Sequence, residues 1–225
     1  MWPYFLVTGI IVLAAILFPR QTPHRLAWAG AFVMLVLFTG LRHKVGMDWN
    51  NYLYMARFME GETWQRALDR AEPGYALLLW ASVKSGWGVY GANLVGAIIF
   101  CLGLLRCARA TSAPWLALAC AMPMLVVVVA MSANRQTIAI GVLLWLVAVW
   151  QQTPLWRRVL ITLLAASFHF SSAFFLLFVA LDVKMRPAFK LALALIMAAA
   201  MMAFMQFSGA MDRYDQMYVG GQSEM

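Results

Sequence analysis

The stretch LAWAGAFVMLVLFTGLRHKVGMDWNNYLYMARF, residues 26 to 58, joins an apolar run to a dense cluster of charged and hydrogen-bonding side chains. Residues 26–41 predict a helix in an apolar environment. After Arg42 the sequence predicts an amphipathic outer loop over about residues 42–75, with a second short helix at 64–71. Its first helix carries an apolar stripe at helical spacing, formed by Tyr52, Met55, Ala56 and Met59.

Composition places the chain among integral membrane proteins. Hydrophobic residues make up 64% and charged residues 12% of the 225 residues, and the mean hydropathy is +0.77. Soluble domains are nearly half apolar and about a quarter charged. Lipid permits only helices or closed barrels, and the alternation typical of barrel strands is missing. We therefore predict an all-α, polytopic, single-domain membrane protein over residues 1–225, with about seven or eight transmembrane helices. Its apolar segments are 2–18, 26–41, 89–105, 114–131, 136–150, 159–181 and 190–210.

The piece GYALLLWASVKSGWG, residues 74–88, leaves the topology open, because it is short and interrupted by Lys84 and could either span or re-enter. If it does not cross, six arginines share one face, which the positive-inside tendency makes cytoplasmic. The outer loop and the turn at 134–136 then share the opposite face. The basic segment 184–190 would also lie outside, against that tendency. The six arginines are Arg20, Arg25, Arg106, Arg109, Arg157 and Arg158.

The patterns of charge, cysteine and histidine exclude several partners and kinds of site. The net charge of +8 comes largely from short basic clusters between apolar segments, which are typical flanks of membrane helices, so we predict no nucleic-acid partner. The three cysteines lack CxxC spacing and the three histidines lack ligand spacing, so we predict no disulfide, no metal and no cofactor. Residues 2–18 lack a basic n-region and a small-residue cleavage site, which predicts a retained helix.

Arg42 and Asp48 are the first candidate site residues. Arg42 ends an apolar run, where a planar guanidinium suits a phosphate group, although a snorkelling arginine is the commoner case at a helix end. Gly46 offers a turn whose backbone N–H groups could face a ligand. Asp48 precedes Trp49 and suits the N-cap of the amphipathic helix and acid/base work about equally.

Arg135 and Gln136 form a second candidate. The apolar run after Arg135 has 15 residues, which at about 1.5 Å per residue falls short of the ~30 Å of hydrocarbon. We therefore expect the helix to begin near Ser132, with Arg135 and Gln136 at the membrane boundary. A charge there should face a polar cavity or pair with an acid, Asp48 or Glu72, and both alternatives stay open.

His169 lies near the middle of the segment 159–181. An intramembrane histidine suits a base, a proton shuttle or a donor, and an interhelical hydrogen bond explains it about equally well. Helical spacing would place small residues beside it, which suits close packing or a cavity. These are Ala165, Ala166, Ser172 and Ala173.

A family resemblance is carried by four motifs in this order: LRHKVGMDWNNYLYMARF (41–58), AEPGYALLL (71–79), ANRQTIAIG (133–141) and ASFHFSSAFFLL (166–177). Together they resemble the EpsG family of bacterial exopolysaccharide and capsule membrane proteins, over about residues 35 to 180. DRYDQMY (212–218) is a fainter match, and Trp49 replaces the tyrosine usual after the aspartate. Family members generally continue with more membrane helices, so the resemblance implies a truncated or divergent end at Met225.

The resemblance implies a role like that of Wzy-type polymerases, as in O-antigen, capsule and exopolysaccharide biosynthesis. These join undecaprenyl-pyrophosphate-linked oligosaccharide repeat units on the outer face of the bacterial inner membrane. The chain would be a metal-independent glycosyltransferase in the lipid bilayer, with a chain-length regulator or other assembly protein as a further partner. Arg42 and Arg135 would hold the pyrophosphate. Asp48 is the first candidate, and His169 the second, for the base that takes the proton from the attacking hydroxyl. The substrate-binding residues, whose aromatic members would stack on sugars, would be Trp49, Tyr52, Glu72, Tyr75 and Gln136.

Other classes stay open beside the polymerase. A membrane acyltransferase acting on the same glycans would also use an intramembrane histidine, but it has no need for two arginines on one face. A flippase or transporter for the lipid-linked glycan would use the same binding residues without a base. Conservative changes at Asp48 and His169 should therefore leave a transporter working. A structural subunit of the assembly machinery is the remaining alternative.

Overall fold

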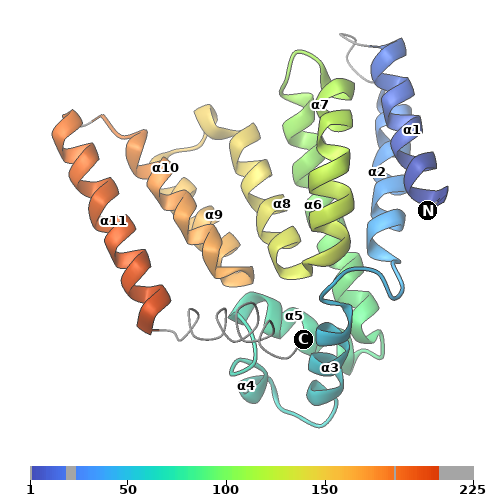
Figure 1. The fold of residues 1–225 in the computed structure, drawn as a ribbon, viewed down its shortest axis with the longest axis horizontal. Helices are drawn as coiled ribbons and strands as arrows, with labels where there is room; N and C mark the ends of the chain where they lie inside the picture. Colours follow the sequence, from blue (N-terminus) through green and yellow to red (C-terminus); the bar gives the residue numbers. More distant parts are fainter. Residues whose placement is uncertain (1, 19–23, 185, 208–225) are drawn as a thin grey trace, which may run out of the picture. The chain divides into compact units, whose positions relative to one another are not determined.

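Helices dominate the described part of the chain, which is residues 2–18, 24–184 and 186–207 of a computed structural model (Figure 1). No strand occurs among these residues, so the predicted all-α class is confirmed. The elements are α1 (Trp2–Leu17), α2 (Arg25–Gly40), α3 (Trp49–Met59), α4 (Trp64–Ala67), α5 (Pro73–Lys84), α6 (Gly88–Arg109), α7 (Pro114–Ala121), the π-helix η1 (Met122–Ala130), α8 (Asn134–Ala148), the 3₁₀ helix η2 (Trp150–Gln152), α9 (Leu155–Phe168), the 3₁₀ helix η3 (Phe170–Phe174), α10 (Phe175–Leu181) and α11 (Pro187–Phe207).

Two compact units divide the chain, Met1–Ala173 and Phe174–Met225. The second unit holds α10 and α11, which pack against each other. The single domain over residues 1–225 stays a prediction, and the motif DRYDQMY (212–218) lies outside the described residues. All candidate site residues belong to the first unit.

Helix α6 is the centre of the first unit, because α2, α5, α7 and α8 all pack against it. Its backbone comes very close to that of α8. A Cβ atom on Gly103 would overlap the carbonyl group of Gly141, and one on Gly141 would overlap the backbone of Phe100. Small residues permit such close contact between membrane helices. The α6–α8 pair therefore fixes where the first turn of α8 lies.

The two ends of the first unit differ in charge. The end of α2, the starts of α6 and α8, and the end of α9 meet the segment 42–84, and we call this the loop end (Figure 1). All five acidic residues between positions 1 and 173 lie here, within 48–72. The opposite end, which we call the basic end, holds the start of α2, the end of α6 and the start of α9. These helix ends carry five of the six arginines predicted to share one face, while Arg20 lies outside the described residues. The five are Arg25, Arg106, Arg109, Arg157 and Arg158.

The predicted amphipathic helix is confirmed as α3, whose apolar stripe is buried. It packs against α5 and α6, and their joint core includes Tyr52, Tyr75 and Ile138. The prediction of a second helix over 64–71 is wrong at its C-terminal end, because α4 ends at Ala67. After that residue the chain continues as turns up to Pro73.

Helix α5 remains at the loop end. Trp80 Nε1 donates a hydrogen bond to the Glu62 carbonyl at 3.1 Å, and Lys84 Nζ donates to the Glu60 carbonyl at 2.9 Å. Both contacts tie α5 to the segment between α3 and α4. Its 12 residues rise about 18 Å, which is well short of a bilayer. The structure therefore favours the non-crossing alternative for residues 74–88.

The segment 159–181 is not one helix, so the prediction that placed His169 on a continuous helical face is wrong. Helix α9 ends at Phe168, and His169 is extended, with φ −153° and ψ 114°. The N–H of Phe170 donates to Glu72 at 3.5 Å instead of to a helical carbonyl. A tertiary contact has replaced the intrahelical bond that periodicity assumes. Helix α8 begins at Asn134, after a one-residue break and within two residues of the predicted start near Ser132.

Apolar side chains cover much of the outer surface of these helices. On α1, Trp2 is 86%, Leu6 66% and Ile16 69% exposed. Among the described helices, Gly88–Arg109 alone is long and apolar enough to cross a membrane by length and composition, and the other apolar helices are shorter. The count of seven or eight spans stays a prediction.

Candidate functional site

One carboxylate joins two predicted site residues at the loop end. Glu72 precedes α5, and its Oε2 lies 2.8 Å from Nη1 of Arg135 at the start of α8. Its Oε1 lies 3.3 Å from Nδ1 of His169, just after α9. The ion pair left open as an alternative for Arg135 therefore exists, with Glu72 as the partner. Three segments far apart in sequence meet at this carboxylate.

The electrostatics of the junction keep Glu72 ionised. Burial works to raise the pKa of Glu72, but the hydrogen bond with His169 and the charge of Arg135 outweigh it and lower the pKa to about 2. An ionised carboxylate can only accept, so it takes the Nδ1–H of His169 and leaves Nε2 free to accept a proton. The side chains of Arg135 and His169 remain 30% and 29% exposed. Both are accessible to a substrate.

Two buried tyrosines hold the first turn of α8. The hydroxyl of Tyr52 accepts the backbone N–H of Arg135 at 3.4 Å, and Nδ2 of Asn134 donates to the hydroxyl of Tyr75 at 3.4 Å. The two rings lie 5.5 Å apart. A helix N-terminus carries partial positive charge, and Arg135 adds a full charge to it. This end of α8 therefore favours an anion, and in this structure the anion beside Arg135 is the Glu72 carboxylate.

Arg42 is placed differently from Arg135. It is 5% exposed, and its Nη1 donates to the carbonyls of Thr39, at 3.3 Å, and Ala130. Its Nη2 donates to Oδ1 of Asn93 at 3.4 Å. The two carbonyls belong to the ends of α2 and η1, where a cation is favourable. Arg42 therefore connects three helices beneath the loop, and its Nε has no hydrogen-bond partner among the described residues.

The turn between Arg42 and α3 packs on the segment after η1. Gly46 has φ +97°, which glycine adopts readily, and a Cβ atom there would overlap the Met131 carbonyl. The N–H of Met47 donates to Oγ of Ser132 at 3.0 Å. The predicted turn is confirmed, and this N–H group is used by the protein itself.

The side chains of Asp48 and Gln136 make no hydrogen bond or ion pair with any described residue, and both residues are partly exposed. Asp48 takes the predicted N-cap position of α3, but its side chain makes no capping hydrogen bond. Its charge interacts electrostatically with Arg42 and Tyr52. The carboxylate oxygens of Asp48 are therefore available to a substrate.

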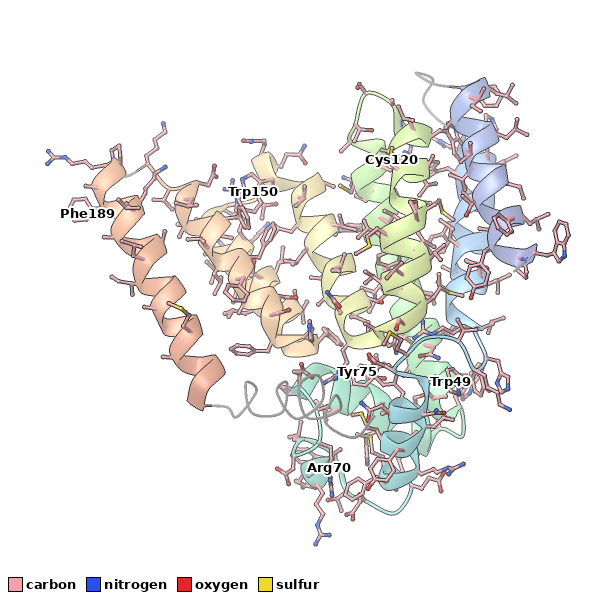
Figure 2. The ribbon with its side chains drawn as sticks, viewed as in Figure 1. Trp49, Arg70, Tyr75, Cys120, Trp150 and Phe189 are labelled. Carbon is pink, nitrogen blue, oxygen red and sulfur yellow. The ribbon has the colours of Figure 1, made fainter. Side chains whose placement is uncertain are left out.

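The aromatic candidates belong to the core of the loop. Figure 2 labels Trp49 on the side of α3 and Tyr75 near the bundle helices. Trp49, Tyr52 and Tyr75 are 5%, 2% and 0% exposed. Trp49 packs edge-on against His43, with ring centres 5.6 Å apart, and beside Tyr90 at 5.8 Å. None of the three offers an open ring face in this structure, and stacking on sugars stays a prediction.

The motifs that meet at this junction also belong to one known family. The model of the EpsG family matches residues 25–220, nearly the whole chain. The chain belongs to the EpsG family. Membership in EpsG associates the chain with the membrane and with polysaccharide biosynthesis. Searches of curated proteins and of solved structures found no match.

Sequence reasoning missed two amides of this EpsG-family site. Asn93 in α6 accepts the hydrogen bond from Arg42, and Asn134 in α8 donates to Tyr75. Both are buried, and each has one polar atom without a hydrogen-bond partner among the described residues. An amide inside the apolar run 89–105 was the available signal for Asn93, because buried polar groups in membrane helices need partners.

Metal ligands do not gather in the part of the EpsG-family chain that the structure describes. No group of three or more His, Cys, Asp or Glu side chains there could hold a metal ion. The metal independence of the reaction stays a prediction.

Proposed function

We propose that the chain is a multi-pass inner-membrane protein that polymerises undecaprenyl-pyrophosphate-linked oligosaccharide repeat units by glycosyl transfer. The observation that carries the proposal is the junction of Glu72, Arg135 and His169, where a cation and an oriented imidazole share one ionised carboxylate. EpsG membership supports polysaccharide precursors as the substrate class. Such a transfer needs a site for the leaving anion and a group that takes a proton.

The proposed reaction exchanges one bond at the anomeric carbon of the donor. The acceptor hydroxyl forms a bond to this carbon while the bond to the pyrophosphate oxygen breaks. Undecaprenyl pyrophosphate leaves with the bonding electrons, and the hydroxyl proton goes to the base. Arg135 would stabilise the leaving charge together with the N-terminus of α8. Losing one such electrostatic contact typically costs about 10²–10³-fold in rate.

His169 is the favoured base. Glu72 accepts its Nδ1–H, so Nε2 can take the proton. Asp48 is the second candidate, because its carboxylate has no partner among the described residues. This order reverses the preference drawn from the sequence. We assign Arg42 a supporting role, in which its charge and hydrogen bonds hold the turn before α3.

The position of the site suits an amphiphilic substrate. The basic end favours a cytoplasmic location by the positive-inside tendency, which places the loop end outside. The polyprenyl tail would then lie in the bilayer, the pyrophosphate beside Arg135 and the glycan over the loop. A chain-length regulator would contact the same outer face.

Complementation of a polymerase-deficient strain tests the proposal, with glycan length read on a gel and variants matched for their amount in the membrane. We expect the parent chain to restore long glycans. Arg135→Ala and His169→Ala should leave mainly single repeat units, because each loses about 10²-fold or more in transfer rate. Arg66→Ala is the matched control, since Arg66 is an exposed loop arginine that pairs with Glu62, and it should keep long glycans.

Three results would count against the proposal. A parent chain that never lengthens the glycan contradicts polymerisation. Full-length glycan from both His169→Gln and Asp48→Asn, with loss only in Arg135→Ala, shows that neither residue is the required base and removes the assigned proton transfer. Equal damage from Arg66→Ala and Arg135→Ala removes the specific assignment of Arg135.

A further inference from the structure

A cavity of about 810 Å³ lies at the basic end, away from the proposed site. It opens between α1, α2 and α7, and its apolar lining includes Ile10, Met34 and Trp115. Arg25, at the start of α2, and Arg109, at the end of α6, also line it. The cavity therefore combines an apolar groove with two cations.

The groove lies where α1 and α2 pack against different neighbouring helices. Near the loop end the two helices are in contact, with the rings of Tyr4 and Phe38 5.4 Å apart. Over their whole lengths, α1 packs mainly against α7, whereas α2 packs mainly against α6. Trp115 lines the space left between them and is backed by Trp28, whose ring centre lies 5.0 Å away.

Among the described residues of the first unit, no carboxylate lies at the end that carries Arg25 and Arg109. All acidic residues between positions 1 and 173 lie within 48–72, at the loop end. Both arginines are exposed, and neither guanidinium group makes a hydrogen bond or ion pair with a described residue. An arginine fork matches the oxygens of a phosphate group and donates charge-assisted hydrogen bonds to it. The charge of the groove is therefore complementary to an anionic amphiphile.

We propose that this groove binds one glycerophospholipid with an anionic headgroup. Its phosphate would lie between Arg25 and Arg109, and one acyl chain would lie along Ile10, Met34 and Trp115. The basic end is the end expected in the cytoplasmic leaflet, where anionic lipids are abundant. The site is separate from the junction at Glu72, so lipid binding does not depend on the proposed polymerase activity.

Gly30 provides a way to fill the groove without disturbing helix packing. It lines the groove, and a Cβ atom on it would meet nothing within 4 Å. Gly30→Leu therefore places a side chain in the space of the acyl chain without a steric clash at Cβ. Gly9→Leu is the matched control, because Gly9 of α1 also has open space around it and does not line the groove.

The experiment measures phospholipid bound per chain by native mass spectrometry. The full chain is purified in mild detergent and incubated with phosphatidylglycerol or phosphatidylcholine. We expect the parent and Gly9→Leu to retain phosphatidylglycerol in preference to phosphatidylcholine. Gly30→Leu should lose about tenfold in phosphatidylglycerol affinity. The double variant Arg25→Gln/Arg109→Gln should bind both lipids equally, since it loses about tenfold for the anionic lipid.

Each contrary result overturns a stated part of the proposal. Equal retention by Gly30→Leu and the parent removes the groove as the binding site. Equal retention of the two lipids by the parent removes the proposed contact of Arg25 and Arg109 with an anionic headgroup. Preferential retention of undecaprenyl phosphate over phosphatidylglycerol in competition replaces the phospholipid by a polyprenyl occupant. Loss in Gly9→Leu as large as in Gly30→Leu shows that the effect is not specific to the groove.

Discussion

Glu72 determines the ionisation and orientation of both its partners. A carboxylate whose pKa is lowered to about 2 stays negative, so it supports the charge of Arg135 and fixes the tautomer of His169. The same residue also closes the gap between α9 and η3 by accepting the N–H of Phe170. The Glu72 side chain therefore affects both the ionisation of the site and the backbone conformation between α9 and η3.

Glu72→Gln should change how stability depends on pH. The native pKa of Glu72 is lowered from 4.5 to about 2, so its contribution is complete above about pH 4.5 and is lost as the pH falls toward 2. That contribution is about 3 kcal/mol at most. In detergent, we expect the parent to be the more stable at pH 6, and the gap between parent and Glu72→Gln to narrow by pH 3.

Thermal unfolding at the two pH values measures this gap. Glu62→Gln is the control, because Glu62 pairs with Arg66 at the surface, where ion pairs contribute little. A gap that is constant from pH 6 to pH 3 would contradict the role assigned to Glu72.

Sequence reasoning at this scale identified residue types better than residue roles. Glu72 was one of two acids named as an ion-pair partner of Arg135, because an arginine at a membrane boundary needs one. Nothing in the sequence distinguished the buried Arg42 from the accessible Arg135, since both follow or begin an apolar run. Their difference depends on acceptors that lie far away in the sequence, the Ala130 carbonyl for Arg42 and the Glu72 carboxylate for Arg135.

Periodicity predicted most helices but not the break inside the segment 159–181. That break, at His169, lies in apolar and small-residue sequence with no proline or glycine to mark it, whereas the break at Ala133 falls between the predicted apolar segments 114–131 and 136–150. At His169, the hydrogen bonds to Glu72 compensate the backbone for the lost helical bond. The periodicity of one segment cannot predict a hydrogen bond that another segment supplies. Both breaks place functional groups at the loop end.

The contact between α6 and α8 predicts a sharp difference between two glycines. Gly103→Ala should destabilise the protein by about 1–3 kcal/mol or more, because the new methyl group would overlap the backbone of Gly141 and force the helices apart. Gly9→Ala, in open space on α1, should be neutral or slightly stabilising. Thermal unfolding of the purified variants in detergent compares them. Equal stability of the two would contradict the packing of this pair.

At the scale of the whole chain, composition and family motifs predicted the all-helical class and EpsG membership. They did so because both depend on many residues, so errors at single positions cancel. The division at Phe174 was not predicted, since no linker-like sequence marks it. The number of membrane crossings depends on short helices whose lengths fall below one bilayer thickness.

Cysteine labelling tests the proposed orientation. In a chain with Cys101, Cys107 and Cys120 replaced by alanine, Met47→Cys introduces a thiol at a 91% exposed position of the loop end. Leu155→Cys does so at the basic end, where Leu155 is 45% exposed. A membrane-impermeant maleimide should label position 47 in intact spheroplasts and position 155 only after permeabilisation. The reverse pattern would place the proposed site in the cytoplasm and reject it.

The separation of charge between the two ends also has an electrical consequence. Five basic residues balance five acidic ones between positions 42 and 75, whereas the described part of the first unit's basic end carries five arginines and no acid. Moving one elementary charge through a membrane potential of 100 mV involves about 2.3 kcal/mol. An inverted first unit would hold its five arginines against the field at a cost on the order of 10 kcal/mol. In a cell with a negative interior, the membrane potential would therefore help to keep the first unit in this orientation.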